Sequence, residues 1–183
     1  MMFINTKIEG LFILEPKIFG DDRGYFFESY NKNTLDNFLG TEYNFVQDNE
    51  SKSVYGVIRG LHYQLSPFSQ AKLVRVLEGK VYDVAVDLRE NSPTFLSWVG
   101  VELSAENKRQ FLIPKGFAHG FSVLSETAIF AYKCDEYYNP KAEAGIIYND
   151  AFLGIDWKIK EENVKISPKD ALLPKLENAE MNF

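Results

Sequence analysis

The sequence predicts an all-β domain, a sandwich or barrel of short strands with a few short helices. From residue 54 to residue 135, extended apolar-rich runs recur at roughly ten-residue spacing, separated by turn residues at 78–79 and 91–93. Aromatic side chains make up 15% of the chain, with 15 Phe and 10 Tyr, and this composition favours strands over helices. Residues 80–89 alternate between two faces, which is typical of a half-buried strand.

Length and composition limit the class of protein. The 183 residues predict one domain over residues 1–183, with no repeat or linker. A net charge of -6 and a pI of about 5.0 exclude a nucleic-acid partner, which needs a basic face. The single Cys134 excludes an internal disulfide and fits a reducing compartment. With no signal peptide and no long apolar window, we expect a cytoplasmic protein with no membrane partner.

The amino-terminal segment predicts two short strands, at Phe3–Ile8 and Gly10–Ile18. Pro16 limits the second to an edge or a bent strand because proline cannot donate to a ladder. A strand pair of this kind often needs a partner sheet, which could come from another subunit. Asp21-Asp22-Arg23-Gly24 then predicts a turn by composition, and Tyr25–Tyr30 predicts an alternating strand.

The first half of the chain predicts one helix, at Asn31–Leu39, with an asparagine cap, one apolar face and Gly40 at its end. Residues 140–183 are mixed, and their three prolines prevent a long helix. Further strands are expected at Phe45–Asn49, Ala71–Leu77, Lys80–Arg89, Phe95–Leu103, Phe111–Ile113, Ala118–Val123 and Ala128–Asp135.

The first candidate catalytic residue lies in the stretch Arg59-Gly60-Leu61-His62-Tyr63-Gln64. His62 is one of two histidines, and imidazole exchanges protons near neutral pH. If the stretch is extended, His62 shares a face with Gly60 and Gln64, while Arg59 points the other way. His62 is then a candidate base, and Gly60 on the same face has no side chain to block a ligand. The alternative is a core histidine satisfied by hydrogen bonds.

The ligand set argues against a metal. A metal site in a β-barrel needs several His and carboxylate ligands at strand spacing, such as a His-x-His pair. This chain has Gln64 where the second histidine belongs, and its only other histidine is His119. We therefore expect no metal.

A metal-free set of acid, base and cation remains. Lys72, on a neighbouring expected strand, is a point charge suited to a developing oxyanion. Tyr132 is either a core aromatic or a phenol acid. Asp170 is either a surface acid or the carboxylate that orients an imidazole. For Lys72, too, the alternative is a solvated lysine at a strand edge.

Many ordered motifs resemble one family, the dTDP-4-dehydrorhamnose 3,5-epimerases, which are metal-free cupins. The resemblance runs nearly end to end, with no departure at the residues that matter. The matching segments are Asp21-Asp22-Arg23-Gly24 with Phe26 and Glu28, Gln47–Asn49, Arg59–Gln64, Lys72, Pro114-Lys115-Gly116-Phe117-Ala118-His119-Gly120-Phe121, Tyr132, Tyr137-Tyr138-Asn139-Pro140, Glu143 and Lys169-Asp170. The resemblance implies a cupin-type jelly-roll and no cofactor.

The resemblance also implies a reaction. The substrate would be a dTDP-linked 4-keto-6-deoxyhexose, epimerised at C3 and C5 beside the C4 ketone in dTDP-L-rhamnose biosynthesis. His62 would be the base, paired with Asp170, and Tyr132 would be the acid on the opposite face. Lys72 would stabilise the enolate.

The remaining site residues follow from the same resemblance. Arg59 and Lys169 would hold the diphosphate, and Tyr138 would stack on thymine. The other substrate contacts would be Gln47, Asn49, His119 and Glu143. Arg23, Phe26 and Glu28 would reach the site from a second subunit, so we expect a homodimer.

Two other functions remain open. One is a related enzyme that epimerises only C3 or only C5, or that acts on another nucleotide sugar with the same residues. The other is a catalytically dead cupin that binds sugar nucleotides, but the presence of His62, Lys72 and Tyr132 argues against it.

Overall fold

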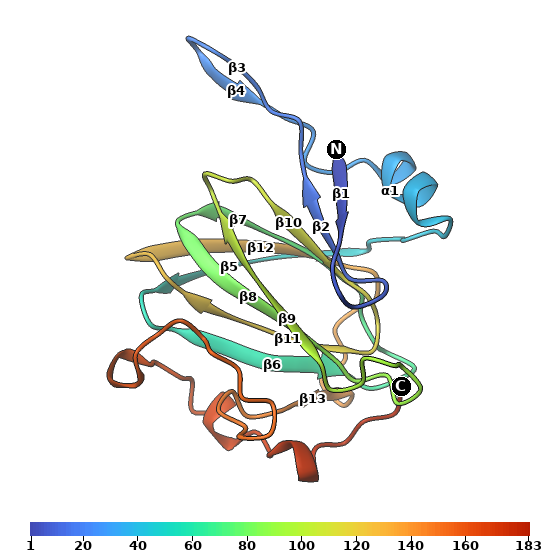
Figure 1. Ribbon diagram of the computed structural model, residues 1–183, viewed down its shortest axis with the longest axis vertical. Helices are drawn as coiled ribbons and strands as arrows, with labels where there is room; N and C mark the ends of the chain where they lie inside the picture. Colours follow the sequence, from blue (N-terminus) through green and yellow to red (C-terminus); the bar gives the residue numbers. More distant parts are fainter.

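Two antiparallel sheets face each other in the computed structural model, which describes all of residues 1–183 (Figure 1). One sheet has the strand order β1-β2-β10-β7-β12-β5, and the other β13-β6-β11-β8-β9. The strands are β1 (Met2–Asn5), β2 (Phe12–Glu15), β5 (Gln47–Val54), β6 (Ile58–Gln64), β7 (Lys72–Glu78), β8 (Lys80–Asp87), β9 (Trp98–Ser104), β10 (Gln110–Ile113), β11 (Phe117–Val123), β12 (Thr127–Cys134) and β13 (Glu143–Gly145). The all-β prediction is confirmed, and the architecture is a sandwich of the cupin type.

The main core lies between the two sheets. Val74 and Val76 of β7 face Val81 and Ala85 of β8, and Phe111 packs among them. The prediction that β8 is half-buried is wrong, because its other face is also covered from residue 84 onward. Burial on both faces follows from the carboxy-terminal segment, which lies over the five-stranded sheet.

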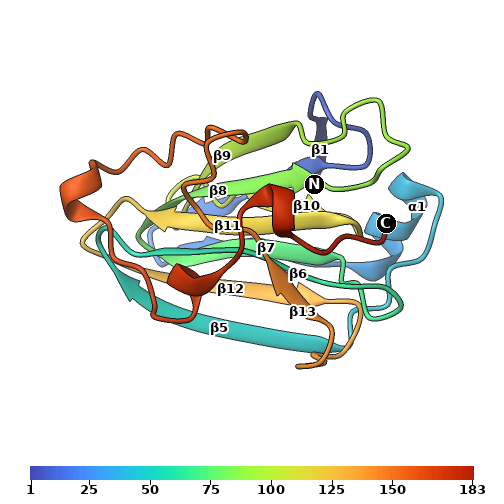
Figure 2. The ribbon, with the colours of Figure 1, turned by 90° about the horizontal axis from the view of Figure 1, so that it is seen from below.

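The carboxy-terminal segment contains no α-helix, as predicted. It forms three 3-10 turns, η1 (Glu161–Asn163), η2 (Asp170–Leu172) and η3 (Leu176–Asn178), along the outer face of β6 and β11 (Figure 2). Buried Asp150 accepts hydrogen bonds from the backbone N–H groups of residues 152, 153 and 176, so it ties the segment together. No helix in the structure is long and apolar enough to cross a membrane.

The predicted helix is confirmed as α1 (Lys32–Leu39). The Asn31 side chain caps it by accepting from the Thr34 N–H at 3.1 Å, and Gly40 ends it in the left-handed conformation. Leu35 packs against the outer face of the six-stranded sheet. The amino-terminal strands do join a partner sheet, as expected, and within the chain that sheet is their own: β2 pairs with β10.

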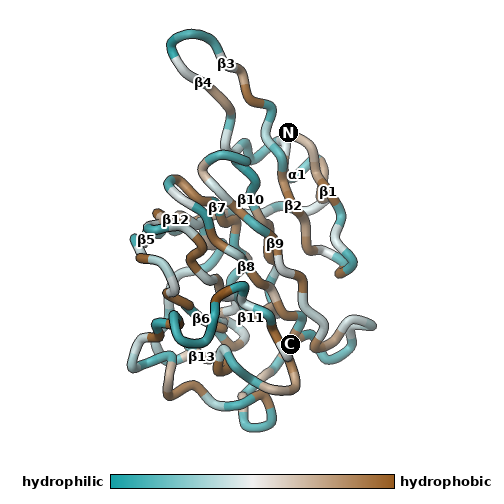
Figure 3. Tube along the Cα trace, turned by 60° about the vertical axis from the view of Figure 1, so that its left-hand side comes forward, coloured by the Kyte–Doolittle hydropathy of each residue, from teal (hydrophilic) through white to brown (hydrophobic).

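A short hairpin, β3 (Phe19–Asp21) with β4 (Gly24–Phe26), projects away from the sandwich (Figure 1). The predicted turn is present, and Asp21 accepts from the Arg23 N–H at 2.9 Å. The strand expected over Tyr25–Tyr30 ends at Phe26, since nothing beyond the hairpin extends the ladder. Both arms carry hydrophobic residues around a hydrophilic tip (Figure 3), and all six strand residues are exposed.

Candidate active site

A cavity of about 270 Å³ opens between the two sheets and gathers side chains from both. The strands β6, β11 and β13 of one sheet face β5, β7 and β12 of the other across it. Most of the residues selected from the sequence line this cavity: Gln47, Asn49, Arg59, His62, Lys72, His119, Tyr132, Tyr138 and Glu143. The fold therefore brings together residues spread over nearly a hundred positions of the chain.

An irregularity in β6 places His62 and Arg59 on the same side. His119 pairs with His62 and Phe121 pairs with Arg59, so β6 holds one residue more than β11 between these pairs. The strict alternation predicted for residues 59–64, with Arg59 pointing away from His62, is therefore wrong. Gly60 does not open the pocket either: it has φ +116°, and a Cβ there would lie 2.6 Å from the Gly120 Cα, so glycine lets β6 and β11 approach.

The imidazole of His62 is held by a buried carboxylate. Its Nε2 lies 2.9 Å from Oδ1 of Asp170, whose other oxygen accepts from the Gly60 N–H at 3.2 Å. Burial raises the pKa of Asp170, but the hydrogen bond and charge of His62, with the Gly60 N–H and Ser167, outweigh burial and hold the pKa below its usual value. An ionised carboxylate requires a donor, so neutral His62 carries its proton on Nε2. Its Nδ1 is the basic atom.

Lys72 supplies an unpaired cation. It points inward from β7, is 9% exposed, and its ammonium makes no hydrogen bond or ion pair within the chain. Burial lowers its pKa, and the neighbouring acidic groups of Cys134, Asp83 and Glu143 oppose that shift. A buried ammonium without a partner is costly, so this position suits an anionic oxygen of a ligand.

Tyr132 faces the cavity from the opposite sheet to His62. It belongs to β12 in the six-stranded sheet, whereas His62 belongs to β6 in the five-stranded sheet. Its hydroxyl makes no hydrogen bond within the chain, and burial raises its pKa, so the phenol stays protonated at neutral pH. The arrangement therefore places a base and a proton donor on opposite walls.

Polar side chains at the entrance of the cavity are hydrogen-bonded to one another. Glu143 accepts from the Tyr138 hydroxyl and from Lys169 Nζ, each at 2.7 Å. Burial raises the pKa of Glu143, but Lys169 and Tyr138 outweigh burial and hold the pKa below its usual value. Gln47 accepts from the Tyr138 N–H at 3.0 Å and donates to Asn49 at 2.9 Å. The rim is thus a prearranged set of donors and acceptors.

Three predicted site residues lie away from this cavity in the chain. Arg23 and Phe26 are on the projecting hairpin, and the Arg23 side chain is 90% exposed and paired with Asp21. Glu28, just beyond the hairpin, accepts from the Asn31 side chain at 3.0 Å. Their contribution from a second subunit stays a prediction.

Sequence reasoning missed the roles of two polar residues. Gln64 donates to the carbonyls of Phe68 and Tyr137 and accepts from the Asn139 N–H, so its amide holds two loops at the cavity. Asp83 holds His119, but the alternation of β8 predicts Asp83 on the polar face of a half-buried strand, so the sequence contained no signal for this role. No group of three or more His, Cys, Asp or Glu side chains is arranged to hold a metal.

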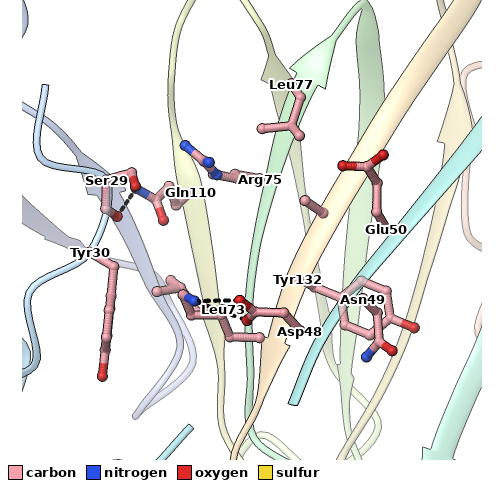
Figure 4. Close-up of a pocket in the computed structure, with 12 residues that line it drawn as sticks. Ser29, Tyr30, Asp48, Asn49, Glu50, Leu73, Arg75, Leu77, Gln110 and Tyr132 are labelled. Atoms are coloured by element: carbon pink, nitrogen blue, oxygen red, sulfur yellow. Dashed lines mark hydrogen bonds and ion pairs between the residues drawn. The ribbon is translucent and has the colours of Figure 1, made fainter. Parts of the chain in front are cut away.

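A second hollow, of about 320 Å³, lies on the outer face of the six-stranded sheet (Figure 4). Its wall includes Arg75, Gln110 and the ion pair between Lys133 and Asp48 at 2.9 Å. It contains no histidine and therefore no histidine–carboxylate pair. The inner cavity is therefore the candidate active site.

Comparison with known proteins identifies this cupin-type sandwich as an isomerase, and among the isomerases as an epimerase. The chain belongs to the dTDP-4-dehydrorhamnose 3,5-epimerase family, whose model matches residues 5–178. The dTDP-4-dehydrorhamnose 3,5-epimerase of Salmonella typhimurium is 54% identical over 179 residues, covering 98% of this chain and 97% of that protein.

Solved structures agree. The dTDP-4-dehydrorhamnose 3,5-epimerase of Elizabethkingia anophelis superposes with a TM-score of 0.94 at 54% identity, covering 97% of each chain. The dTDP-6-deoxy-D-glucose-3,5-epimerase of Legionella pneumophila, in complex with dTDP-4-keto-L-rhamnose, has a TM-score of 0.93 and 58% identity, covering 97% of this chain and 93% of that one.

Proposed function

We propose that the protein is a dTDP-4-dehydro-6-deoxy-D-glucose 3,5-epimerase that forms dTDP-4-dehydro-L-rhamnose. The observation that carries the proposal is the placement of His62 and Tyr132 on opposite walls of one cavity, with the Lys72 ammonium unpaired among them. Inversion at carbon needs this arrangement, because the proton must leave from one face and return to the other. Residues 1–183 act as one catalytic domain in this proposal.

The reaction follows from the acidity of the carbons beside the ketone. Nδ1 of His62 removes the proton from C5 or C3, and the electrons of that C–H bond move to the C4 oxygen as an enolate. The Lys72 ammonium stabilises the oxygen. The Tyr132 hydroxyl then donates a proton to the opposite face of the same carbon. The phenolate is reprotonated from solvent, and the His62 imidazolium releases to solvent the proton that it took. Asp170 keeps the imidazole oriented and stabilises its protonated form.

The rest of the proposed site binds the nucleotide. Arg59 and Lys169 hold the diphosphate, for which guanidinium and ammonium groups are suited. Tyr138, 51% exposed at the entrance, stacks on thymine, and the rim amides of Gln47 and Asn49 contact the substrate. A homodimer brings Arg23, Phe26 and Glu28 of one copy to the cavity of the other. No cofactor takes part.

Deuterium exchange tests the proposal. The protein is incubated with dTDP-4-dehydro-6-deoxy-D-glucose in deuterated water, and NMR reads deuterium at C3 and C5 separately. The expected result is exchange at both carbons with the L-rhamno product. Exchange at only one carbon identifies a 3-only or 5-only epimerase instead. Binding of the nucleotide sugar with no exchange at either carbon identifies a protein that binds without catalysis.

A further inference from the structure

A fully buried carboxylate lies beneath the cavity, and the mechanism above does not use it. Asp83 is 0% exposed and occupies an inward position of β8 between Val81 and Ala85, which belong to the apolar core. Burying a charge among apolar side chains is expensive unless the charge is paired. The groups around Asp83 must therefore compensate for the cost of burying its charge.

The first partner is His119, on the neighbouring strand β11. Its Nε2 lies 3.0 Å from Oδ1 and 3.1 Å from Oδ2 of Asp83, and its ring also stacks on Phe130. Burial lowers the pKa of His119, and Asp83 opposes the shift, so the ring is neutral at neutral pH. With its proton donated from Nε2, the ring presents the Nδ1 lone pair to the cavity, where it makes no hydrogen bond within the chain.

The second group that Asp83 influences is Lys72, which points inward from β7 of the facing sheet and forms no ion pair with it. Burial raises the pKa of Asp83 and lowers that of Lys72, and each charge opposes the shift in the other. Four groups on four different strands act on the Lys72 ammonium: Asp83, Glu143, Cys134 and His119. Glu143 is held by Lys169 and Tyr138, and burial raises the pKa of Cys134 to about 11. Asp83 is therefore the one nearby anion that is wholly buried.

We propose that Asp83 is a positioning residue of the active site, which fixes His119 with Nδ1 as an acceptor and keeps the Lys72 ammonium charged for the ketone oxygen. The inference rests on the proposed function, since it assigns the enolate oxygen to Lys72. It also specifies what His119 binds: a neutral ring with a free lone pair accepts from a sugar hydroxyl and does not neutralise a phosphate.

The test of the charge compares two substitutions in β8. Asp83→Asn keeps the shape and removes the charge, so Lys72 loses its proton at a lower pH than in the wild type. We expect kcat to fall at least about tenfold at neutral pH, and the alkaline limb of the kcat profile to move to lower pH by about one unit or more. The matched control is Asp87→Asn, which removes another 0% exposed carboxylate of the same strand, one bonded to Arg89, Ser92 and Thr94.

Asp87→Asn is expected to lower Tm and leave the alkaline limb in place. An Asp83→Asn enzyme that keeps the wild-type limb and kcat overturns the proposal. The profile distinguishes a charge effect from simple loss of structure, because unfolding lowers Tm and amplitude without moving the limb.

A measurement on the wild-type protein needs no variant to fold and no turnover. The chain has only two histidines, so 15N NMR of labelled imidazole gives two sets of ring signals, which a His62→Gln sample assigns. We expect His119 to be neutral and protonated on Nε2 from pH 7 to pH 8. A doubly protonated His119, or a proton on Nδ1, overturns the proposal. Failure of the proposed function would appear separately, as a wild-type protein that does not exchange deuterium into its substrate.

Discussion

The inner cavity and the projecting hairpin carry the two parts of the predicted site, and the chain holds them very differently. Cavity residues are fixed by hydrogen bonds, as in the 2.9 Å contact between His62 and Asp170. The hairpin makes few contacts with the sandwich. Phe19 and Phe26 are 54% and 70% exposed, Arg23 pairs with Asp21 at the tip, and Lys108 donates to the Tyr25 hydroxyl at 2.9 Å. The residues proposed for the acid–base chemistry thus all lie at the cavity of one chain, whereas the hairpin residues lie away from it.

This difference supports the proposed homodimer. An exposed strand pair with apolar side chains is an aggregation hazard unless a partner covers it. A closed dimer in which each hairpin covers the other copy removes that exposure and brings Arg23 to a cavity. The cavity chemistry is therefore expected to depend on residues of one chain, and substrate binding on residues of two.

The largest effect is expected from substitution of His62, the proposed proton acceptor. His62→Ala should abolish both solvent exchange and epimerisation, with a loss of at least about 10²–10⁴-fold, because both steps begin with proton removal. NMR in deuterated water measures the exchange, and a coupled assay measures the product. Tm should fall as well, because the buried Asp170 carboxylate loses the imidazole that pairs with it, so both assays are run well below the Tm of the variant. Wild-type exchange by His62→Ala would place the base elsewhere.

Substitution of Tyr132, the proposed acid, should stop proton return without stopping proton removal by His62. Tyr132→Phe keeps the ring but loses the hydroxyl, so the enolate still forms and His62 returns the proton to the original face. Deuterium should enter the sugar while its configuration is retained, and epimer formation should fall by about 10²-fold or more. Normal epimerisation would show that another group or water is the acid. Loss of exchange as well would mean that Tyr132 serves binding or deprotonation, and the two-face mechanism would be wrong.

The sequence predicts the sandwich well because its signals are local. Tight turns and alternating runs locate β7, β8 and β12, and capping residues locate α1. The burial of both faces of β8 was missed because the segment that covers it has no periodic pattern of its own. The shift in β6 was missed as well, because an extra residue in a strand leaves no mark on the alternation of the sequence.

The candidate site was predictable only in part, for a related reason. Nothing local joins Asp170 to His62 across 108 positions, and the pairing came from the family resemblance. Asp83 looked like the polar face of a half-buried strand, and only the facing sheet shows that it points inward. Long-range pairing in a sandwich is set by topology, which single-strand patterns do not contain.

A smaller effect is expected from the hairpin, and it can be tested by mixing subunits. Arg23→Ala should reduce kcat/KM by about tenfold or more, the contribution of one charged hydrogen bond, without lowering Tm. If Arg23 acts across the interface, a heterodimer of Arg23→Ala and His62→Ala chains contains one intact site. Refolding the two variants together should therefore recover about a quarter of wild-type activity, since about half of the dimers are mixed.

The control for this experiment is a mixture of His62→Ala and Tyr132→Phe chains. Both of these residues belong to the cavity of one chain, so no site in the mixed dimer is intact and activity should not recover beyond that of the single variants. Recovery limited to the Arg23 mixture supports a shared site. A fully active monomer, measured by light scattering at assay concentration, would contradict it.

The smallest effect is expected from metal removal, where the prediction is no change. Gln64 occupies the position that a second strand ligand would need, and its amide is already bonded to Phe68, Tyr137 and Asn139. His62 and His119 each hold an aspartate through Nε2, which leaves no cluster of donors for an ion. Activity should therefore survive exhaustive chelation, and added zinc, iron or manganese should not raise it. Loss of activity with EDTA that one of these metals restores would mean that the proton chemistry needs an ion, and that Lys72 is not the group that stabilises the enolate.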